Sequence, residues 1–500
     1  MLERHPAPTA LRAGVEALFV FGLSVMVLWV FADRTGYEGD DINSVVPMLN
    51  LRAALDGAIL IYRPHWQPLS YELGAAVYGI TGSVNAIFAL AQISIAAGIA
   101  TIYYTVRAVG LPPLLFLPLL MLFPEIVYSG LYYNSSALGF PLACLAVFLA
   151  LTGSRRRSAA AIGILLSLAI LMRMDYVLVA PVVAAMRIWM RCDLWDVIIA
   201  ALSGIAIFAL ALASGLLDPA AAIETYNLAR AEIIARADSP GWNDFRKMMV
   251  TTVVFSPTGW VFLAIALIWT ALTPRAWLPA AIGVLCLTPM LFSARNMLTA
   301  KYMLPVFALL PVIAALIWID IADRLRPALY RTLTGLWIAM TAFLLVAALE
   351  PTKEAPHVQI VFADSRQIPT HDGRRTWGAY LWHMARLPHT KAETDAMANT
   401  LLKAVLEPRD VALAFVGKQN LFEPGGIVWR NLQLALAQAG YHGHVVGHEA
   451  LRFDLPAGPL FLFTSDSRAD HDLSGTCVIE LLEKEAQATI LSSLGACSAS

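Results

Sequence analysis

The chain has 500 residues, of which 58% are hydrophobic and 14% charged, and its formal net charge is −1. Soluble globular proteins carry about 25% charged residues, so this composition excludes an ordinary soluble fold and indicates that most of the chain faces lipid. The balanced charge predicts no nucleic-acid partner. Five cysteines are too few for a disulfide framework.

Long apolar runs dominate the first 350 residues, and a membrane-spanning helix needs about 20 such residues. We expect an all-α, polytopic membrane domain with about eleven transmembrane helices. They are Val15–Phe31, Val84–Val106, Leu111–Val127, Ala137–Leu151, Ala159–Met172, Val177–Met190, Val197–Leu216, Met249–Ala271, Trp277–Phe292, Tyr302–Ile319 and Leu333–Leu349.

The short pair Ala159–Met172 and Val177–Met190 has an alternative interpretation as one long kinked helix, which would invert everything downstream. Lysine and arginine in short loops favour the cytoplasmic side. With a cytoplasmic N-terminus, every inner loop is basic, which favours two separate helices. The inner charges are Arg4, Arg12, Arg107, Arg155, Arg156, Arg157, Arg187, Arg191, Arg275, Arg324, Arg326 and Arg331.

Three segments then lie outside: Ala32–Ser83, Asp218–Met248 and everything after Glu350. Composition changes after Glu350, so we expect a transmembrane domain over 1–350 and a small soluble α/β domain over 351–500. Its predicted strands are Val411–Val416 and Leu460–Thr464, and its predicted amphipathic helix is Ile427–Ala439, closed by Gly440. Cys477 and Cys497 would pair only in an oxidising compartment.

The stretch after the first helix is acidic, with Glu38, Asp40 and Asp41 within four residues. Mutual repulsion in a cleft raises at least one carboxyl pKa and prepares a general base, or the group collects a divalent cation. The alternative is a solvated acidic turn that ends a helix.

Further along the same outer loop, Tyr62–Leu69 combines basic and aromatic side chains, and Pro64 and Pro68 predict an extended backbone. Arg63 and His65 are suited to phosphate, and the face of Trp66 is suited to a sugar ring. The alternative is an aromatic belt at the membrane interface with its usual basic companions.

Two more clusters lie at predicted outer helix ends. Arg173 and Asp175 form one, and Arg295 with Lys301 and Tyr302 forms the other. Ionisable groups at such depth are usually functional or paired. Arg173 and Asp175 have mutual pairing as an alternative, whereas Arg295 and Lys301 either hold a lipid phosphate or extend to headgroups.

Together these clusters resemble the GT-C glycosyltransferases, in the branch of protein O-mannosyltransferases and the aminoarabinose transferase of lipid A. The resemblance rests on a first helix followed by paired acids, then "YRPHWQPLSYE", "LAILMRMDY" and "RNMLTAKYMLPVFALLPVIAA", and it spans roughly residues 15–350. The chain departs from that pattern in Asp40-Asp41 for Asp-Glu, in a broken proline pair, and in Lys301-Tyr302 for Arg-Tyr. Where some relatives carry a second acid, it reads Tyr132-Tyr133-Asn134-Ser135-Ser136.

The resemblance implies inverting transfer of a sugar from a polyprenyl-phosphate donor to an envelope acceptor, such as lipid A or lipopolysaccharide, a glycan or a protein, on the outer face of the membrane. The compact loops favour the bacterial inner membrane, with the endoplasmic reticulum as the alternative. Asp40 is then the general base, and Asp41 orients the acceptor, holds Asp40 or binds a divalent metal. Arg63, Arg295 and Lys301 stabilise the leaving phosphate. The other expected substrate-binding residues are Glu38, His65, Trp66, Arg173, Asp175 and Tyr302.

Two rival functions remain open from the sequence. A transporter or flippase of a lipid-linked substrate is one, although such proteins usually show repeated halves and charges near the bilayer midplane, and we identify neither here. A non-catalytic assembly or sensor protein, with the region after Glu350 as its working part, is the other.

Overall fold

The computed structural model describes a helical region and a set of strands. Described are 10–32, 67–108, 126, 129–130, 133–153, 156–189, 194–220, 222–223, 304–309, a few positions between 327 and 339, and the strands of 359–491. The chain divides into two compact units, one of 1–31, 62–73 and 88–383 and the other of 32–61, 74–87 and 384–500.

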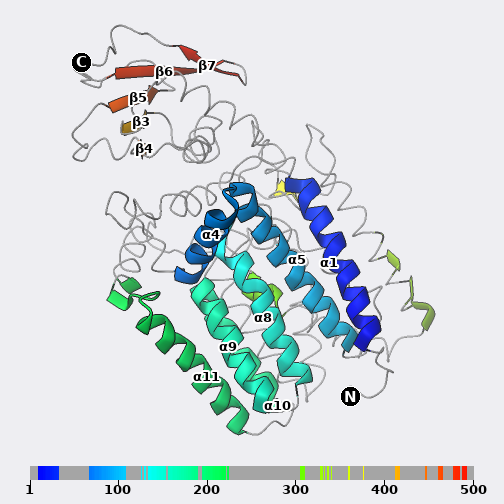
Figure 1. The fold of residues 1–500 in the computed structure, drawn as a ribbon. Coiled ribbons are helices and arrows are strands. Elements are labelled where there is room, and N and C mark those ends of the chain that lie inside the picture. Colours follow the sequence, from blue (N-terminus) through cyan, green and yellow to red (C-terminus); the bar gives the residue numbers. More distant parts are fainter. Residues whose placement is uncertain are drawn as a thin grey trace, which may run out of the picture. The chain divides into compact units, whose positions relative to one another are not determined.

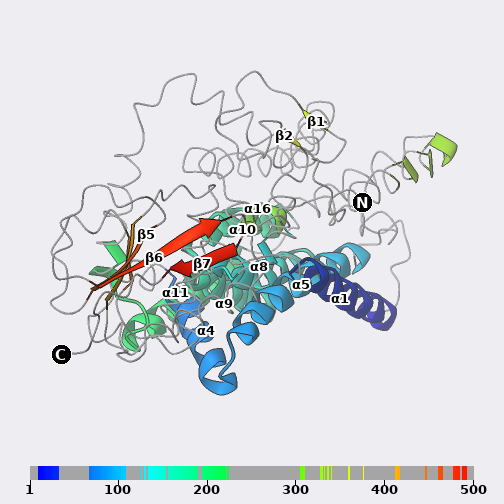
Figure 2. The same cartoon turned by 90° about the horizontal axis from the view of Figure 1, so that it is seen from above.

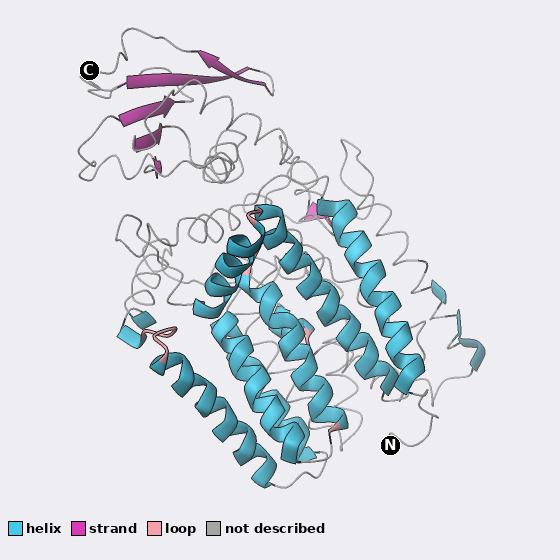
Figure 3. Ribbon diagram, in the orientation of Figure 1, coloured by secondary structure: helices cyan, strands magenta, loops and turns pink. Residues whose placement is uncertain are grey.

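Figure 3 shows the described helices. They are α1 Ala10–Ala32, α4 Pro68–Thr81, α5 Val84–Ala108, α8 Ser135–Thr152, α9 Arg156–Met172, the 3-10 helix η2 Met174–Leu178, α10 Val179–Trp189, α11 Leu194–Ala213 and α16 Leu304–Phe307. Among them, α1, α5, α8, α9, α10 and α11 match predicted apolar runs to within a few residues at most ends, whereas α4 was not predicted. Within the first unit, α1, α5, α8, α9 and α11 lie side by side (Figure 1).

Four of these helices, α1, α5, α8 and α11, are long and apolar enough to cross a membrane. Their outer surfaces expose large apolar side chains such as Phe19 in α1 (71% exposed) and Leu202 in α11 (61%). Contiguous apolar surface of this kind needs lipid or a partner to cover it. The chain is therefore a multi-pass membrane protein. The count of eleven spans stays a prediction. Helix α9, which corresponds to the predicted span Ala159–Met172, has 17 residues and is not among these four, and the other predicted spans lie wholly or partly outside the described residues.

The chain reverses direction between α9 and α10. Arg173 is extended, with φ −162° and ψ 127°, which ends α9 before η2 begins. Tyr176 then bonds to Ser136 at the start of α8, while Arg187, near the end of α10, bonds to the Gly153 carbonyl at the end of α8. Hence α10 returns along α8, and the prediction of two separate helices is confirmed.

Small residues allow the helices to approach closely. A Cβ at Gly98 of α5 would collide with the ring of Phe140 in α8, and one at Gly163 of α9 would collide with the Ala200 backbone of α11. On the same α9–α11 seam, a Cβ at Gly204 would lie 2.7 Å from Ser167 Oγ. Such contacts bring backbones together as in other membrane bundles.

One expectation for the first outer loop is wrong. Pro68 was expected to hold the chain extended, but it is the first residue of α4. Proline fits this position because its fixed φ suits a helix and the missing N–H has no intrahelical partner there. The helix ends at Thr81, and Gly82 (φ +64°) donates its N–H to the Tyr78 carbonyl at 2.7 Å.

The strands after residue 350 form two sheets. In the smaller, β1 Gln359–Ile360 pairs antiparallel with β2 Arg375–Thr376. The larger has the order β4-β3-β5-β6-β7, where the first four strands are parallel and β7 runs antiparallel to β6 (Figure 2). Its strands are β3 Ala412–Val416, β4 Val445–Gly447, β5 Leu460–Thr464, β6 Cys477–Lys484 and β7 Gln487–Leu491.

Both predicted strands of this region are confirmed, as β3 and β5. The predicted helix Ile427–Ala439 lies outside the described residues. The α/β character of this region and the boundary at residue 350 therefore remain predictions.

Candidate functional site

A polar cluster is built around the N-terminal end of α8. Asn134 is the residue before the helix, and its Oδ1 accepts the N–H of Ala137 at 2.9 Å. Its Nδ2 donates to the Ser129 carbonyl at 2.7 Å, which folds the preceding segment back onto the helix start. Asparagine favours this position because its side chain satisfies one of the free N–H groups of the first turn.

Tyr133 joins this end of α8 to α4. Its hydroxyl donates to the Ser70 carbonyl at 2.6 Å, across 63 positions of sequence. Burial raises the pKa of Tyr133 well above its usual value, and the nearby Tyr71 adds to the effect, so the phenol stays neutral. Ser70 lies just beyond the predicted basic and aromatic stretch, whose end is thereby held at the α8 terminus.

Tyr176 of η2 joins the cluster from another direction. Its hydroxyl donates to the Ser136 carbonyl at 2.5 Å, and Gly139 leaves the space that the Tyr176 ring occupies. In the same segment Arg173 Nε lies 2.6 Å from Asp175 Oδ2. The Arg173 side chain is buried, whereas Asp175 is 30% exposed. The two residues therefore pair with each other, which is the alternative that the sequence left open.

Two further segments reach the same end. Gly130 lies against α1, because a Cβ placed there would be 2.8 Å from Leu28 Cδ2. The short helix α16 contacts both α8 and η2, and its first residue, Leu304, is fully buried. Parts of α1, α4, η2 and α16 thus lie near the first turn of α8.

Most of the predicted site residues lie outside the described part of the chain. These are Glu38, Asp40, Asp41, Arg63, His65, Trp66, Arg295, Lys301 and Tyr302. Among the described residues no group of three or more histidine, cysteine, aspartate or glutamate side chains could hold a metal ion. The metal role considered for Asp40 and Asp41 therefore stays a hypothesis.

Sequence reasoning did not assign a role to the hydroxyl groups of this cluster. The hydroxyls of Ser129, Ser135 and Ser136 are buried and have no hydrogen-bond partner within the described part of the chain. A signal was present, because Asn134 before two serines and an apolar run is typical of a helix start. What the sequence lacked was the information that the three serines are buried together.

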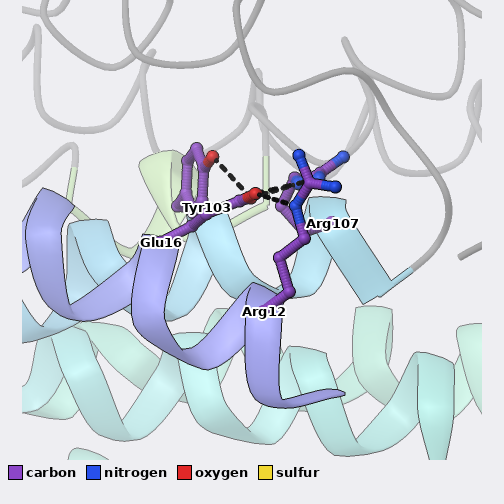
Figure 4. Close-up of polar contacts among 4 residues, drawn as sticks. All are labelled: Arg12, Glu16, Tyr103 and Arg107. Atoms are coloured by element: carbon purple, nitrogen blue, oxygen red, sulfur yellow. Dashed lines mark hydrogen bonds and ion pairs between the residues drawn. The ribbon is translucent and has the colours of Figure 1, made fainter. Parts of the chain in front are cut away.

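The opposite end of the bundle carries ion pairs of a different kind. Glu16 of α1 accepts hydrogen bonds from Arg12, Tyr103 and Arg107, the last two in α5 (Figure 4). The Arg107 Nε to Glu16 Oε2 distance is 2.6 Å. These contacts hold α1 against α5 and so have a structural role. The candidate site is the cluster at the start of α8.

Comparisons with known proteins give structural neighbours only. No protein-family model and no curated protein matches the chain. Two crystal structures of ArnT from Cupriavidus metallidurans do. The structure bound to undecaprenyl phosphate has 14% sequence identity and a TM-score of 0.48, and the match covers 89% of this chain and 82% of the ArnT chain. The apo structure has 14% sequence identity and a TM-score of 0.46, and the match covers 84% of this chain and 75% of the ArnT chain.

ArnT is a lipid A aminoarabinose transferase of the GT-C fold, and so a member of the branch that the sequence motifs resemble. A likeness of folds does not by itself assign a substrate or an activity. The proposal that follows therefore rests on the residues of this chain. The similarity to these two ArnT structures, at TM-scores of 0.48 and 0.46, stands as a resemblance, and no activity is drawn from it.

Proposed function

We propose that the chain is a GT-C-type glycosyltransferase that moves a sugar from a polyprenyl-phosphate donor to an envelope acceptor, with inversion at the anomeric carbon. The observation that carries the proposal is the meeting of four segments at the start of α8. The four segments are α1, α4, η2 and α16, and each lies next to or contains one of the residue clusters predicted from the sequence.

The connections are short in sequence. Asp40 and Asp41 follow α1, and Gln67, which begins the described part of α4's segment, comes directly after Trp66. Lys301 and Tyr302 lie three and two positions before Leu304, the first residue of α16. A chain spans at most about 3.6 Å per residue, which limits how far Lys301 lies from Leu304. Connectivity thus supports a place near the start of α8 for the clusters around Trp66 and Lys301.

The arginines support the membrane orientation. Arg12, Arg107 and Arg187 lie at the end of the bundle opposite the candidate site. Since basic residues favour the cytoplasmic side, the site would face outward, toward the periplasm of a bacterial inner membrane. Nucleotide sugars and ATP are cytoplasmic, so a reaction on that face requires a donor that is already activated and carried by lipid.

The proposed chemistry assigns a role to each group. Asp40 removes the proton from the acceptor hydroxyl as the anomeric carbon is attacked, and the donor phosphate departs. Asp41 positions Asp40 or the acceptor, or holds a divalent metal. Arg63, Arg295 and Lys301 stabilise the charge that develops on the phosphate.

The remaining groups bind the substrates. Trp66 and Tyr302 offer aromatic faces to the sugar, and Glu38 and His65 complete the polar lining. The Arg173–Asp175 pair, with its partly exposed carboxylate, borders the site. We place the region 351–500 on the same outer side, as a small α/β domain.

The test is sugar transfer by purified protein in liposomes, with a panel of radiolabelled polyprenyl-phosphate sugars and an envelope extract as acceptor. We expect Asp40→Asn to lower turnover by about 10²- to 10⁴-fold, the typical effect of losing a general base. Asp218→Asn is the matched control, because Asp218 is an exposed acid beyond the end of α11.

Retention of more than half the activity by Asp40→Asn would refute its assignment as the base. If no donor is used by folded wild-type protein, the glycosyltransferase proposal is wrong. A flipping assay with the same donors in the same liposomes would then test the transporter function.

A further inference from the structure

We propose that the N-terminal end of α8 is a phosphate-binding subsite, in which the hydroxyls of Ser129, Ser135 and Ser136 are donors to the phosphate oxygens. The identity of the phosphate, that of the lipid-linked donor, rests on the proposed function. The donor groups themselves rest on the geometry of this helix end.

The helix supplies the first part of the argument. An α-helix leaves the N–H groups of its first turn without intrahelical partners, and its dipole makes this end favourable for an anion. In α8 the Asn134 side chain satisfies the N–H of Ala137. The N–H groups of Ser135 and Ser136 have no such acceptor among the residues that the structure describes.

The serines supply the second, independent part. Ser129 and Ser136 are fully buried and Ser135 is 3% exposed, yet none of the three hydroxyls has a hydrogen-bond partner among the residues that the structure describes. Buried polar groups in folded proteins are nearly always bonded, because an unsatisfied one costs free energy. Three such groups around one helix start indicate a ligand that is absent from the structure.

Two threonine hydroxyls within α5 behave differently. Thr101 and Thr105 of α5 each donate to the carbonyl four residues earlier, at 2.8 and 2.7 Å. Ser135 and Ser136 have no preceding helical turn to bond to, since α8 begins at Ser135. Their hydroxyls are therefore available to an external acceptor.

The hydrogen-bond donors of the subsite, rather than a net charge beside it, favour an anion over a neutral ligand. The groups that the subsite offers are N–H and O–H donors, and Tyr176, which bonds to Ser136, places Arg173 in the adjoining segment. Arg173 also forms the pair with Asp175, so it adds polarity rather than a full uncompensated charge. A phosphate group fits this arrangement, because it brings acceptor oxygens and negative charge together.

The experiment measures binding of a sugar-free polyprenyl phosphate to the full chain in nanodiscs, by native mass spectrometry. Ser135→Ala and Ser136→Ala are each compared with wild type, and a triple variant combines both with Ser129→Ala. Ser167→Ala is the matched control, a buried serine in the α9–α11 seam. We expect each single change to raise Kd about tenfold, the typical effect of one lost hydrogen bond to a charged group, and the control to leave Kd unchanged.

Thermal unfolding separates binding from folding. Without ligand, the serine variants should melt at the wild-type temperature or above it, because each loses an unsatisfied buried group. Wild-type affinity in the triple variant would overturn the proposal. A lower melting temperature that accounts for the lost affinity would also overturn it.

Two more ligands define what is recognised. Inorganic phosphate should show the same serine dependence if a free phosphate suffices, whereas dependence only with the lipid-linked phosphate would assign the subsite to the donor; both results support a phosphate subsite. Equal serine dependence with a polyprenol that lacks phosphate would refute it.

Sugar transfer, measured separately, tests the proposed function on its own. Serine-dependent phosphate binding without transfer from any donor would leave the subsite standing and remove the glycosyltransferase. If the triple variant keeps both wild-type transfer and wild-type phosphate affinity, the glycosyltransferase proposal stands and the phosphate subsite is refuted.

Discussion

The buried ion pair between α10 and α11 allows a quantitative prediction. Arg187 Nη2 lies 2.6 Å from Asp196 Oδ2, and the two side chains are only 4% and 10% exposed. Arg187 also donates to the Gly153 carbonyl, so one guanidinium joins the ends of α8, α10 and α11. Asp196→Asn would leave this buried cation without a countercharge.

Removing one partner of a buried pair costs about 3–5 kcal/mol, because the other charge remains desolvated and uncompensated. The Arg12–Glu16 pair gives the contrast, since the Arg12 side chain is 71% exposed. Arg12→Ala should cost only about 0.3–0.5 kcal/mol, the usual value for an exposed pair one helical turn apart. The two substitutions should therefore differ several-fold in their effect on stability.

The assay is unfolding in mixed micelles with increasing SDS, which gives the free energy of unfolding for each variant. The double change Arg187→Met with Asp196→Leu should recover much of the loss, because it removes both buried charges. If Asp196→Asn costs no more than Arg12→Ala, the pair is not buried from water as the structure indicates, and the reasoning fails.

Two further changes test the packing on either side of the bundle. Gly139→Ala should displace the ring of Tyr176 and break its hydrogen bond to Ser136, which lowers thermal stability and any transfer activity together. Gly22→Ala is the control: Gly22 has open space around it, so both quantities should stay near wild type. Glu16→Gln should weaken the attachment of α1 to Arg107 and speed hydrogen exchange in α1, and an exchange rate equal to wild type would contradict a role for Glu16 in holding that helix.

The serines and the acidic loop make separate demands on the protein. Asp40 is assigned to the chemical step, whereas Ser135 and Ser136 are assigned to holding the phosphate. Substitutions in the two places should therefore differ in kind. Asp40→Asn should leave phosphate affinity intact while turnover collapses, and the serine variants should lose affinity first.

Local pattern determined much of the fold. Apolar runs of about 20 residues predicted α1, α5, α8 and α11, and short continuous apolar runs predicted β3 and β5 as buried strands. Basic residues between the runs also separated α9 from α10 correctly. These features depend on neighbours within a few positions, so the sequence alone contains them.

Helix α4 shows where local signals mislead. Pro64 and Pro68 suggested an extended segment, yet proline is equally compatible with the first position of a helix. Which conformation forms depends on what packs against the segment, and the Tyr133 hydroxyl bonds to α4 at Ser70.

Only the tertiary structure determined which helix ends meet. The pairing of Arg173 with Asp175 was foreseen because the two are two positions apart, but the Glu16–Arg107 contact joins residues 91 positions apart and the Tyr133–Ser70 bond residues 63 apart. Sequence periodicity reports the apolar face of each helix and carries no register between helices. The orphan hydroxyls at the start of α8 became visible only once packing had buried them together.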